Sequence, residues 1–167
     1  TEVQTCALPI FSAPRCFEIE ERLKEMLDIP VFHDDQHGTA IVVLAGIING
    51  LRVTGKKKED CRVVVNGAGS AGVAITKLLL TYGFKHVTMC DREGIIGKDY
   101  PNLNWMQKKM TEVTNLENAS GTLADALRGA DIFVGVSAPN IVTPEMVSSM
   151  NKDAILFAKI GRASCRE

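Results

Sequence analysis

The sequence predicts an α/β fold in which helices cover both faces of a doubly wound parallel sheet. Short apolar runs alternate with segments of helical period through most of the 167 residues. This alternation is typical of parallel strands joined by right-handed crossovers. A glycine-rich turn directly follows one apolar run and directly precedes a helical segment. Hydrophobic residues make up 46% of the chain, which is enough for the core of one domain.

The elements are expected in the following order. Apolar residues at helical spacing predict a helix over 17–28, which Pro30 ends. A second helix, over 38–51, is apolar on nearly every face and is therefore expected to be buried. A lysine-rich polar connector follows at 54–60. Beyond it we expect strands over 61–66, 86–90, 131–136 and 154–158 and helices over 73–82, 104–112, 123–129 and 143–150.

Charge and cysteine content argue against several classes of protein. The chain carries 19 basic and 20 acidic residues, a net charge of -1, which gives no support for a nucleic-acid or anionic-membrane partner. No charged and apolar signal peptide opens it, and no apolar run approaches the ~20 residues of a membrane span. Five cysteines without C-x-x-C spacing argue against a zinc site or disulfide framework. We expect reduced thiols and a cytoplasmic location.

The two ends of the chain are set apart from the rest. TEVQTCALPI at 1–10 and IGRASCRE at 160–167 have no periodicity that continues into their neighbours. Both resemble translated sequencing-adapter read-through. We therefore treat them as artefactual ends and exclude them from the fold prediction.

The glycine-rich turn, GAGSAG, fits the dinucleotide pattern G-x-G-x-x-G. Its place between a strand and a helix predicts a Rossmann-type phosphate-binding loop. Gly67 is expected to make the tight turn, Gly69 to let the backbone approach a pyrophosphate, and Gly72 to allow close packing of helix and strand. Free N–H groups at the helix start would meet the phosphates. The candidate contacts are Gly67, Ala68, Gly69, Ser70, Ala71 and Gly72.

An aspartate stands about twenty residues further on, at the end of the next strand. Asp91 can accept hydrogen bonds from ribose hydroxyls and would repel a 2′-phosphate, which favours NAD over NADP. Arg92 could instead reach a 2′-phosphate, so NADP stays open. The structural alternative is that Asp91 merely starts a turn.

The segment SAPN follows a later strand. Ligands of such sheets lie beyond the carboxyl ends of the strands, so Ser137, Ala138 and Asn140 are candidates to line the nicotinamide or ribose pocket. A simple Pro-Asn turn explains the segment almost as well.

Two adjacent aspartates, Asp34 and Asp35, stand directly before the apolar helix, between His33 and His37. Carboxylates favour helix starts because they meet orphan N–H groups and the helix dipole. A hard divalent cation is the other interpretation, but it needs about six oxygens and hence further ligands. We interpret both histidines as structural or supporting residues, since imidazole suits softer ions.

The chain resembles the malic enzymes over essentially all of 11–158. The resemblance rests on the motif Phe-x-Asp-Asp-x-x-Gly-Thr-Ala at 32–40, on the apolar helix after it, and on the segments SAPRCFEIE, GAGSAG, CDR, GADIFVGVSAP and TPEMV. It implies oxidative decarboxylation of L-malate to pyruvate and CO2, with reduction of NAD(P)+ and a requirement for Mg2+ or Mn2+. It makes Asp35 a metal ligand and Asp34 a neighbouring metal-site and catalytic residue.

The same resemblance implies a division of the chain and a homodimer. Residues 11–37 would end a metal- and substrate-binding domain with its linker, and 38–159 would form an NAD(P)-binding domain that is incomplete at its end. The family's Glu-Asp metal ligands, its Asn-Pro segment, and its proton-handling tyrosine and lysine have no counterpart here. We therefore expect this chain to be inactive alone and prone to aggregation.

Three further interpretations stay open on the sequence, two of them rivals to the malic enzyme resemblance. The glycine loop also suits a dehydrogenase of the amino-acid or methylenetetrahydrofolate type, which would not need the aspartate pair. A non-catalytic dinucleotide-sensing module would bind NAD without metal-dependent synergy with a substrate. The third, a fragment that is never made as a stable protein, is compatible with the resemblance.

Overall fold

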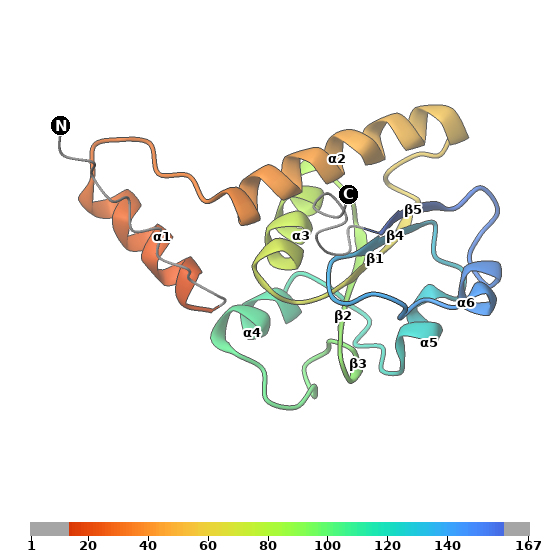
Figure 1. Cartoon of the computed structure of the whole chain (residues 1–167). Coiled ribbons are helices and arrows are strands. Elements are labelled where there is room, and N and C mark those ends of the chain that lie inside the picture. Colours follow the sequence, from red (N-terminus) through yellow and green to blue (C-terminus); the bar gives the residue numbers. More distant parts are fainter. Residues whose placement is uncertain (1–13, 159–167) are drawn as a thin grey trace, which may run out of the picture.

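The structure, a computed structural model, describes residues 14–158 apart from the side chain of Asp35. Its centre is a five-stranded sheet in the order β3-β2-β1-β4-β5 (Figure 1). Strands β1 (Arg62–Asn66), β2 (His86–Asp91), β4 (Ile132–Gly135) and β5 (Ile155–Ala158) are parallel. The order grows outward in both directions from β1, so the predicted doubly wound sheet is confirmed.

Strand β1 forms the middle of the sheet because both of its faces are apolar. Val63, Val64 and Val65 are all buried, and β-branched side chains suit a pleated surface covered on both sides. In register, Val63 lies between Val87 of β2 and Ile132 of β4. The predicted strand thus begins one residue later than expected and ends at the expected place.

Helices cover the two faces of the sheet. Helices α2 (Asp34–Thr54) and α3 (Ser70–Tyr82) pack on one face, and the short helices α5 (Leu123–Leu127) and α6 (Pro144–Ser148) lie on the other. Helix α4 (Trp105–Thr111) buries Met106 and Met110 in a third cluster with Met89 of β2. Helix α1 (Arg15–Met26) extends to the side of the body in Figure 1 and joins that cluster through Cys16 and Phe17.

Helix α2 departs from its prediction in length and in burial. It begins at Asp34 rather than near Gly38, because carboxylates in a first helical turn meet the positive end of the helix dipole. The prediction that the helix is buried on nearly every side is wrong. Ile47 is fully buried, whereas Ile41 and Val42 are 57% and 64% exposed. Only one side of the helix faces α3 and the sheet.

By length and composition alone, Gln36–Thr54 within α2 could cross a membrane, with a mean hydropathy of 1.3. The sequence prediction that no apolar run approaches this length is therefore wrong for this helix. In the structure its buried residues, Ala40, Val43, Ile47 and Leu51, belong to the core on one face of the sheet. Only 17% of the apolar window is buried, so α2 packs through one side and leaves the other exposed.

A short antiparallel strand was not predicted. Strand β3 (Gly94–Ile95) turns back against the end of β2, where Cys90 pairs with Ile95. Gly94 has a φ of +111°, a backbone conformation that favours glycine, and this permits the tight return. The sheet is therefore parallel with one antiparallel edge strand, a common variant of this architecture.

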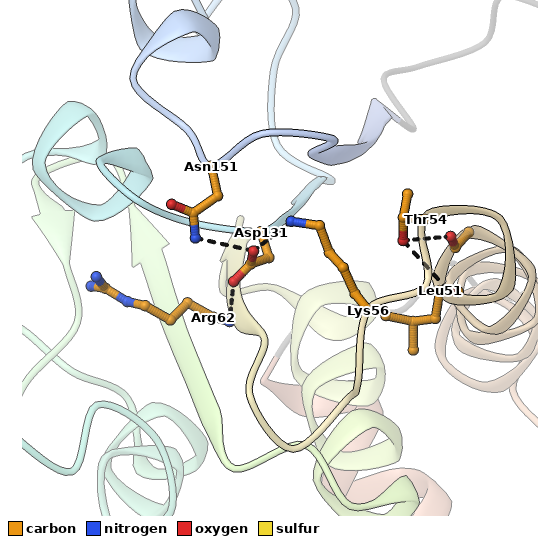
Figure 2. Close-up of polar contacts among 7 residues, drawn as sticks. Leu51, Thr54, Lys56, Arg62, Asp131 and Asn151 are labelled. Carbon is orange, nitrogen blue, oxygen red and sulfur yellow. Dashed lines mark hydrogen bonds and ion pairs between the residues drawn. The ribbon is translucent and has the colours of Figure 1, made fainter.

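A buried carboxylate, that of Asp131, links several segments at the amino ends of the parallel strands (Figure 2). Asp131 accepts hydrogen bonds from Lys56 Nζ at 2.6 Å, from Arg62 N at 3.0 Å and from Asn151 Nδ2 at 3.0 Å. Burial works to raise the pKa of Asp131, but these hydrogen bonds and the charge of Lys56 together hold that pKa below its usual value. The network joins the start of β1, the start of β4 and the turn before β5. It lies at the amino ends of the strands, whereas the glycine loop lies at their carboxyl ends.

Candidate functional site

The glycine loop joins β1 to α3 and contacts β2 and the segment after β4. Gly67 has a φ of +116°, which a residue with a side chain rarely adopts. Its N–H donates to the carbonyl of Cys90 on β2 at 2.8 Å. A Cβ at Gly67 would lie 3.0 Å from the backbone carbonyl of Val136. The tight turn predicted for Gly67 is therefore present, wedged between β2 and the segment after β4.

The two other glycines of the motif differ in what surrounds them. A Cβ on Gly72 would lie about 1.7 Å from the Gly67 carbonyl oxygen, so only glycine permits this contact of helix and loop. Within residues 14–158, and apart from the adjoining residues, no atom comes within 4 Å of a Cβ built on Gly69, so the described part of the loop is open there. Gly69 is the N-cap of α3, and no described side chain caps the helix. An open, uncapped helix start fits a pyrophosphate.

The segment after β4 lies beside this loop, as its place in the sheet predicts. Asn66 Nδ2 donates to Ser137 Oγ at 2.9 Å, and Val136 N donates to the carbonyl of Asn66 at the same distance. Ala138 and Asn140 are exposed, and Asn140 has a φ of +59°. The structure thus brings Ser137 to the glycine loop. The proposed contacts of these residues with a nicotinamide or ribose stay predictions.

Asp91 ends β2 next to the loop and is half-buried. Its Oδ1 accepts from the backbone N–H of Arg92 at 3.0 Å, and its Oδ2 accepts from Gln107 Nε2 at 3.4 Å. Gln107, on α4, was not among the predicted site residues. Its signal in the sequence is the Asn-x-x-Gln pattern at 104–107, which predicts a capping box but not a contact with Asp91.

The direction of α2 is fixed by its contacts with β5. Cβ atoms built on Gly46 and Gly50 would touch Phe157 and Ile155, so α2 runs antiparallel to β5 and its first turn projects beyond the carboxyl ends of the strands, the side of the sheet on which the glycine loop lies. Asp34 is exposed. A Cβ at Gly38 would lie about 2.2 Å from Asp34 Oδ1, so glycine there leaves room for that carboxylate.

The Asp35 side chain lies outside the described residues, so its predicted metal ligation is untested. Within 14–158, no group of three or more His, Cys, Asp or Glu side chains lies close enough to hold a metal ion. Among the described side chains at the start of α2, the carboxylate of Asp34 is therefore the one oxygen ligand of this kind. A hard cation needs more oxygens than that.

The two neighbouring histidines differ, because contacts with α1 are present at His37. His37 Nε2 lies 2.5 Å from Glu20 Oε1, and Lys24 Nζ lies 2.6 Å from the same oxygen. Burial works to raise the pKa of Glu20, but these two hydrogen bonds and the charges behind them bring it below its usual value. His33 is half-buried, and its Nδ1 atom has no hydrogen-bond partner among the described residues. Glu20 thus ties α1 to the first turns of α2.

A pocket of about 270 Å³ lies between α1, the start of α2 and the outer side of α3. His37, Gln36 and Lys77 are among its lining residues, and none of the motif glycines lines it. It is therefore separate from the open loop at Gly69.

A Rossmann-type dinucleotide-binding domain is the class that this sheet, glycine loop and strand-end aspartate define. Residues 36–156 match the family described as "Malic enzyme, NAD binding domain". The chain belongs to the malic enzyme family, and the resemblance seen in the sequence is confirmed.

Individual relatives agree with that assignment. The NAD-dependent malic enzyme of Geobacillus stearothermophilus is 54% identical over 149 residues, which are 88% of this chain and 31% of that enzyme. The NADP-dependent malic enzyme of Haemophilus influenzae is 48% identical over 148 residues, 87% of this chain and 19% of that enzyme. The crystal structure of an NAD-dependent malic enzyme from Thermotoga maritima matches with a TM-score of 0.87 at 47% identity, over 90% of this chain and 41% of that one. The chain therefore spans well under half the length of each of these proteins.

Proposed function

We propose that this chain is the dinucleotide-binding part of a malic enzyme that oxidises and decarboxylates L-malate to pyruvate and CO2 while reducing NAD(P)+. One observation carries the proposal: an open, uncapped glycine loop at the strand ends lies within the segment that matches the malic enzyme NAD-binding domain. The loop supplies the N–H groups for the pyrophosphate.

NAD is the preferred cofactor in this proposal. The Asp91 carboxylate would accept from the hydroxyls of the adenine ribose and repel the 2′-phosphate of NADP. Arg92, exposed beside Asp91, would weaken the preference for NAD by contacting the 2′-phosphate of NADP. Both preferences occur among the relatives, which are named as NAD- and NADP-dependent enzymes.

A divalent metal belongs to the same proposal. Asp35 would bind Mg2+ or Mn2+, with Asp34 beside it, and further oxygens would have to come from elsewhere in the enzyme. When bound, such an ion supplies positive charge next to the substrate oxygens. What supports this role is the motif at 32–40 together with the direction of α2, whose first turn lies on the carboxyl-end side of the strands, as the glycine loop does. A homodimer and a cytoplasmic location remain part of the proposal.

A chimera tests the proposed activity. Residues 15–158 of this chain would replace the matching segment of the Geobacillus stearothermophilus enzyme, to which the chain is 54% identical. We expect the purified chimera to form NADH when malate, NAD and Mn2+ are all present. Omission of Mn2+, or the substitution Asp35→Asn, should reduce the rate at least ~100-fold, because the charge at the substrate oxygens is lost.

The controls separate activity from folding. Thermal melting should show that the chimera and its D35N variant are equally folded. A folded chimera that binds NAD but forms no NADH from malate would contradict the proposed reaction. NAD binding that is indifferent to malate and Mn2+ would favour a dinucleotide-sensing module instead.

A further inference from the structure

We propose that Asn66, the last residue of β1, is a positioning residue for Ser137 and makes its hydroxyl a hydrogen-bond donor to the nicotinamide half of the dinucleotide. The inference rests on the proposed function and adds a residue that was not among the predicted site residues. It starts from one contact between two side chains: Asn66 Nδ2 donates to Ser137 Oγ at 2.9 Å.

Asn66 is a polar residue at the end of an otherwise apolar strand. The three valines before it are buried, and Asn66 itself is only 4% exposed. Burial of an amide costs free energy unless hydrogen bonds replace those that it made with water. Among the described residues, Ser137 is the partner of the Asn66 side chain. The contact therefore offsets part of the cost of burying Asn66.

The backbone of Ser137 is fixed at the glycine loop as well. A Cβ built on Gly67 would lie 3.1 Å from Ser137 N, so the two backbones approach each other closely. One residue before Ser137, Val136 N donates to the carbonyl of Asn66 at 2.9 Å. Ser137 is therefore positioned through both its backbone and its side chain, and each of these contacts involves Asn66 or the glycine that follows it.

The contact with Asn66 also sets the direction of the Ser137 proton. A serine hydroxyl has one donor position and two acceptor positions. Because Asn66 Nδ2 occupies an acceptor position, the Ser137 proton must point toward a different partner. No described residue accepts a hydrogen bond from this hydroxyl, and Ser137 is exposed. The hydroxyl is therefore available to donate to an oxygen atom of a ligand.

The order of the strands assigns this hydroxyl to the nicotinamide half. Strand β1 lies between β2 and β4. Asp91 ends β2 and Ser137 follows β4, so the two residues lie on opposite sides of the glycine loop. With the pyrophosphate at the loop and the adenine ribose at Asp91, the nicotinamide half extends over β4. The oxygens of its ribose and its carboxamide are acceptors for the Ser137 hydroxyl.

The test compares the affinities of the 167-residue chain and its variants for NAD and for ADP, which lacks the nicotinamide half, by calorimetric titration. Ser137→Ala removes the hydroxyl, and Asn66→Leu removes the amide but keeps a side chain of similar volume. Asn66→Asp replaces the donor with an acceptor, so the Ser137 hydroxyl would donate to the new carboxylate instead of the dinucleotide. Asn151→Ala is the matched control, because it removes a hydrogen bond of an asparagine amide, 3.0 Å to Asp131 Oδ1, at the amino ends of the strands.

We expect Ser137→Ala and Asn66→Leu each to raise the Kd for NAD about 5-fold, the usual scale of one lost hydrogen bond, and to change the Kd for ADP less than about 2-fold. Asn66→Asp should weaken NAD binding at least as much as Ser137→Ala does. In a Ser137→Ala background, Asn66→Leu should have an effect below about 2-fold. Asn151→Ala should lower the melting temperature and leave the ADP-to-NAD ratio of Kd values unchanged.

The outcomes are distinguishable. Equal losses of NAD and ADP affinity in Asn66→Leu, the same loss with and without the Ser137 hydroxyl, or undiminished NAD binding by Asn66→Asp would overturn the role of Asn66 and leave the proposed function intact. If Asn66→Leu does not fold, Ser137→Ala and Asn66→Asp still decide, because the first changes an exposed side chain and the second keeps the shape of asparagine. A folded wild-type chain that binds neither NAD nor ADP would overturn both proposals.

Discussion

Single residues of the glycine loop carry different physical constraints, although they belong to one motif. Gly67 needs its positive φ, Gly72 needs the absence of a Cβ because the Gly67 carbonyl occupies that space, and no described residue beyond the adjoining ones lies within 4 Å of a Cβ at Gly69. Packing among the described residues therefore does not require glycine at position 69. A bound pyrophosphate is the reason for glycine that the loop geometry favours.

Alanine should accordingly have different effects at two of these glycines: it should destabilise the fold at Gly72 and weaken NAD binding at Gly69. Gly72→Ala should lower the free energy of unfolding by about 2 kcal/mol or more, because backbone must move to admit the methyl group. Gly69→Ala should cost less than about 1 kcal/mol and weaken NAD binding at least ~10-fold. Urea unfolding and calorimetric titration measure the two quantities. If Gly69→Ala binds NAD as tightly as the wild type, the loop is not the pyrophosphate site.

Asp131 gives a prediction about pH. Its pKa in the folded chain lies below the usual value, so its stabilising contribution is complete above the unfolded pKa and is lost as the pH falls through the folded one. Asp131→Asn should cost about 2 kcal/mol near neutral pH, since Lys56 and the Arg62 N–H lose a charged acceptor. The difference in the free energy of unfolding between the wild type and Asp131→Asn should become smaller below about pH 4. Urea unfolding between neutral pH and pH values below about 4 measures this difference. A difference that does not change with pH would show that the charge of Asp131 does not stabilise the fold.

At the scale of elements, the sequence predicted the strands and most helices to within a few residues, because their apolar periods are local properties of the chain. It did not predict β3, whose two residues have no periodicity to detect. It also misjudged the outer side of α2. An apolar composition shows that a helix can be buried, but burial itself depends on which partners lie around it.

The two sides of α2 provide a second contrast. Ile47→Ala should cost about 2–5 kcal/mol, because it opens a cavity in the core against α3 and the sheet. Ile41→Lys with Val42→Glu should change the free energy of unfolding by less than about 0.5 kcal/mol and should reduce self-association, since both side chains are exposed. Analytical ultracentrifugation measures the association. Strong destabilisation by the charged pair would mean that this side of α2 is buried.

At the scale of the whole molecule, the candidate site combines parts that the sequence reveals to different degrees. The glycine loop and Asp91 could be predicted because a motif fixes their spacing. The position of Gln107 could not, since it depends on how α4 packs against β2. The start of α2 is an intermediate case: the motif identifies the aspartates, and only the antiparallel course of α2 along β5 shows that their turn lies on the carboxyl-end side of the strands.

A dinucleotide is expected to occupy the carboxyl ends of the strands at the glycine loop. Backbone amide chemical shifts of the isotopically labelled chain during titration with NAD test this most directly. Saturable shifts should concentrate at 67–72, 91–92 and 137–140. Absence of saturable shifts from a folded chain, or shifts confined to the pocket between α1 and α3, would contradict it.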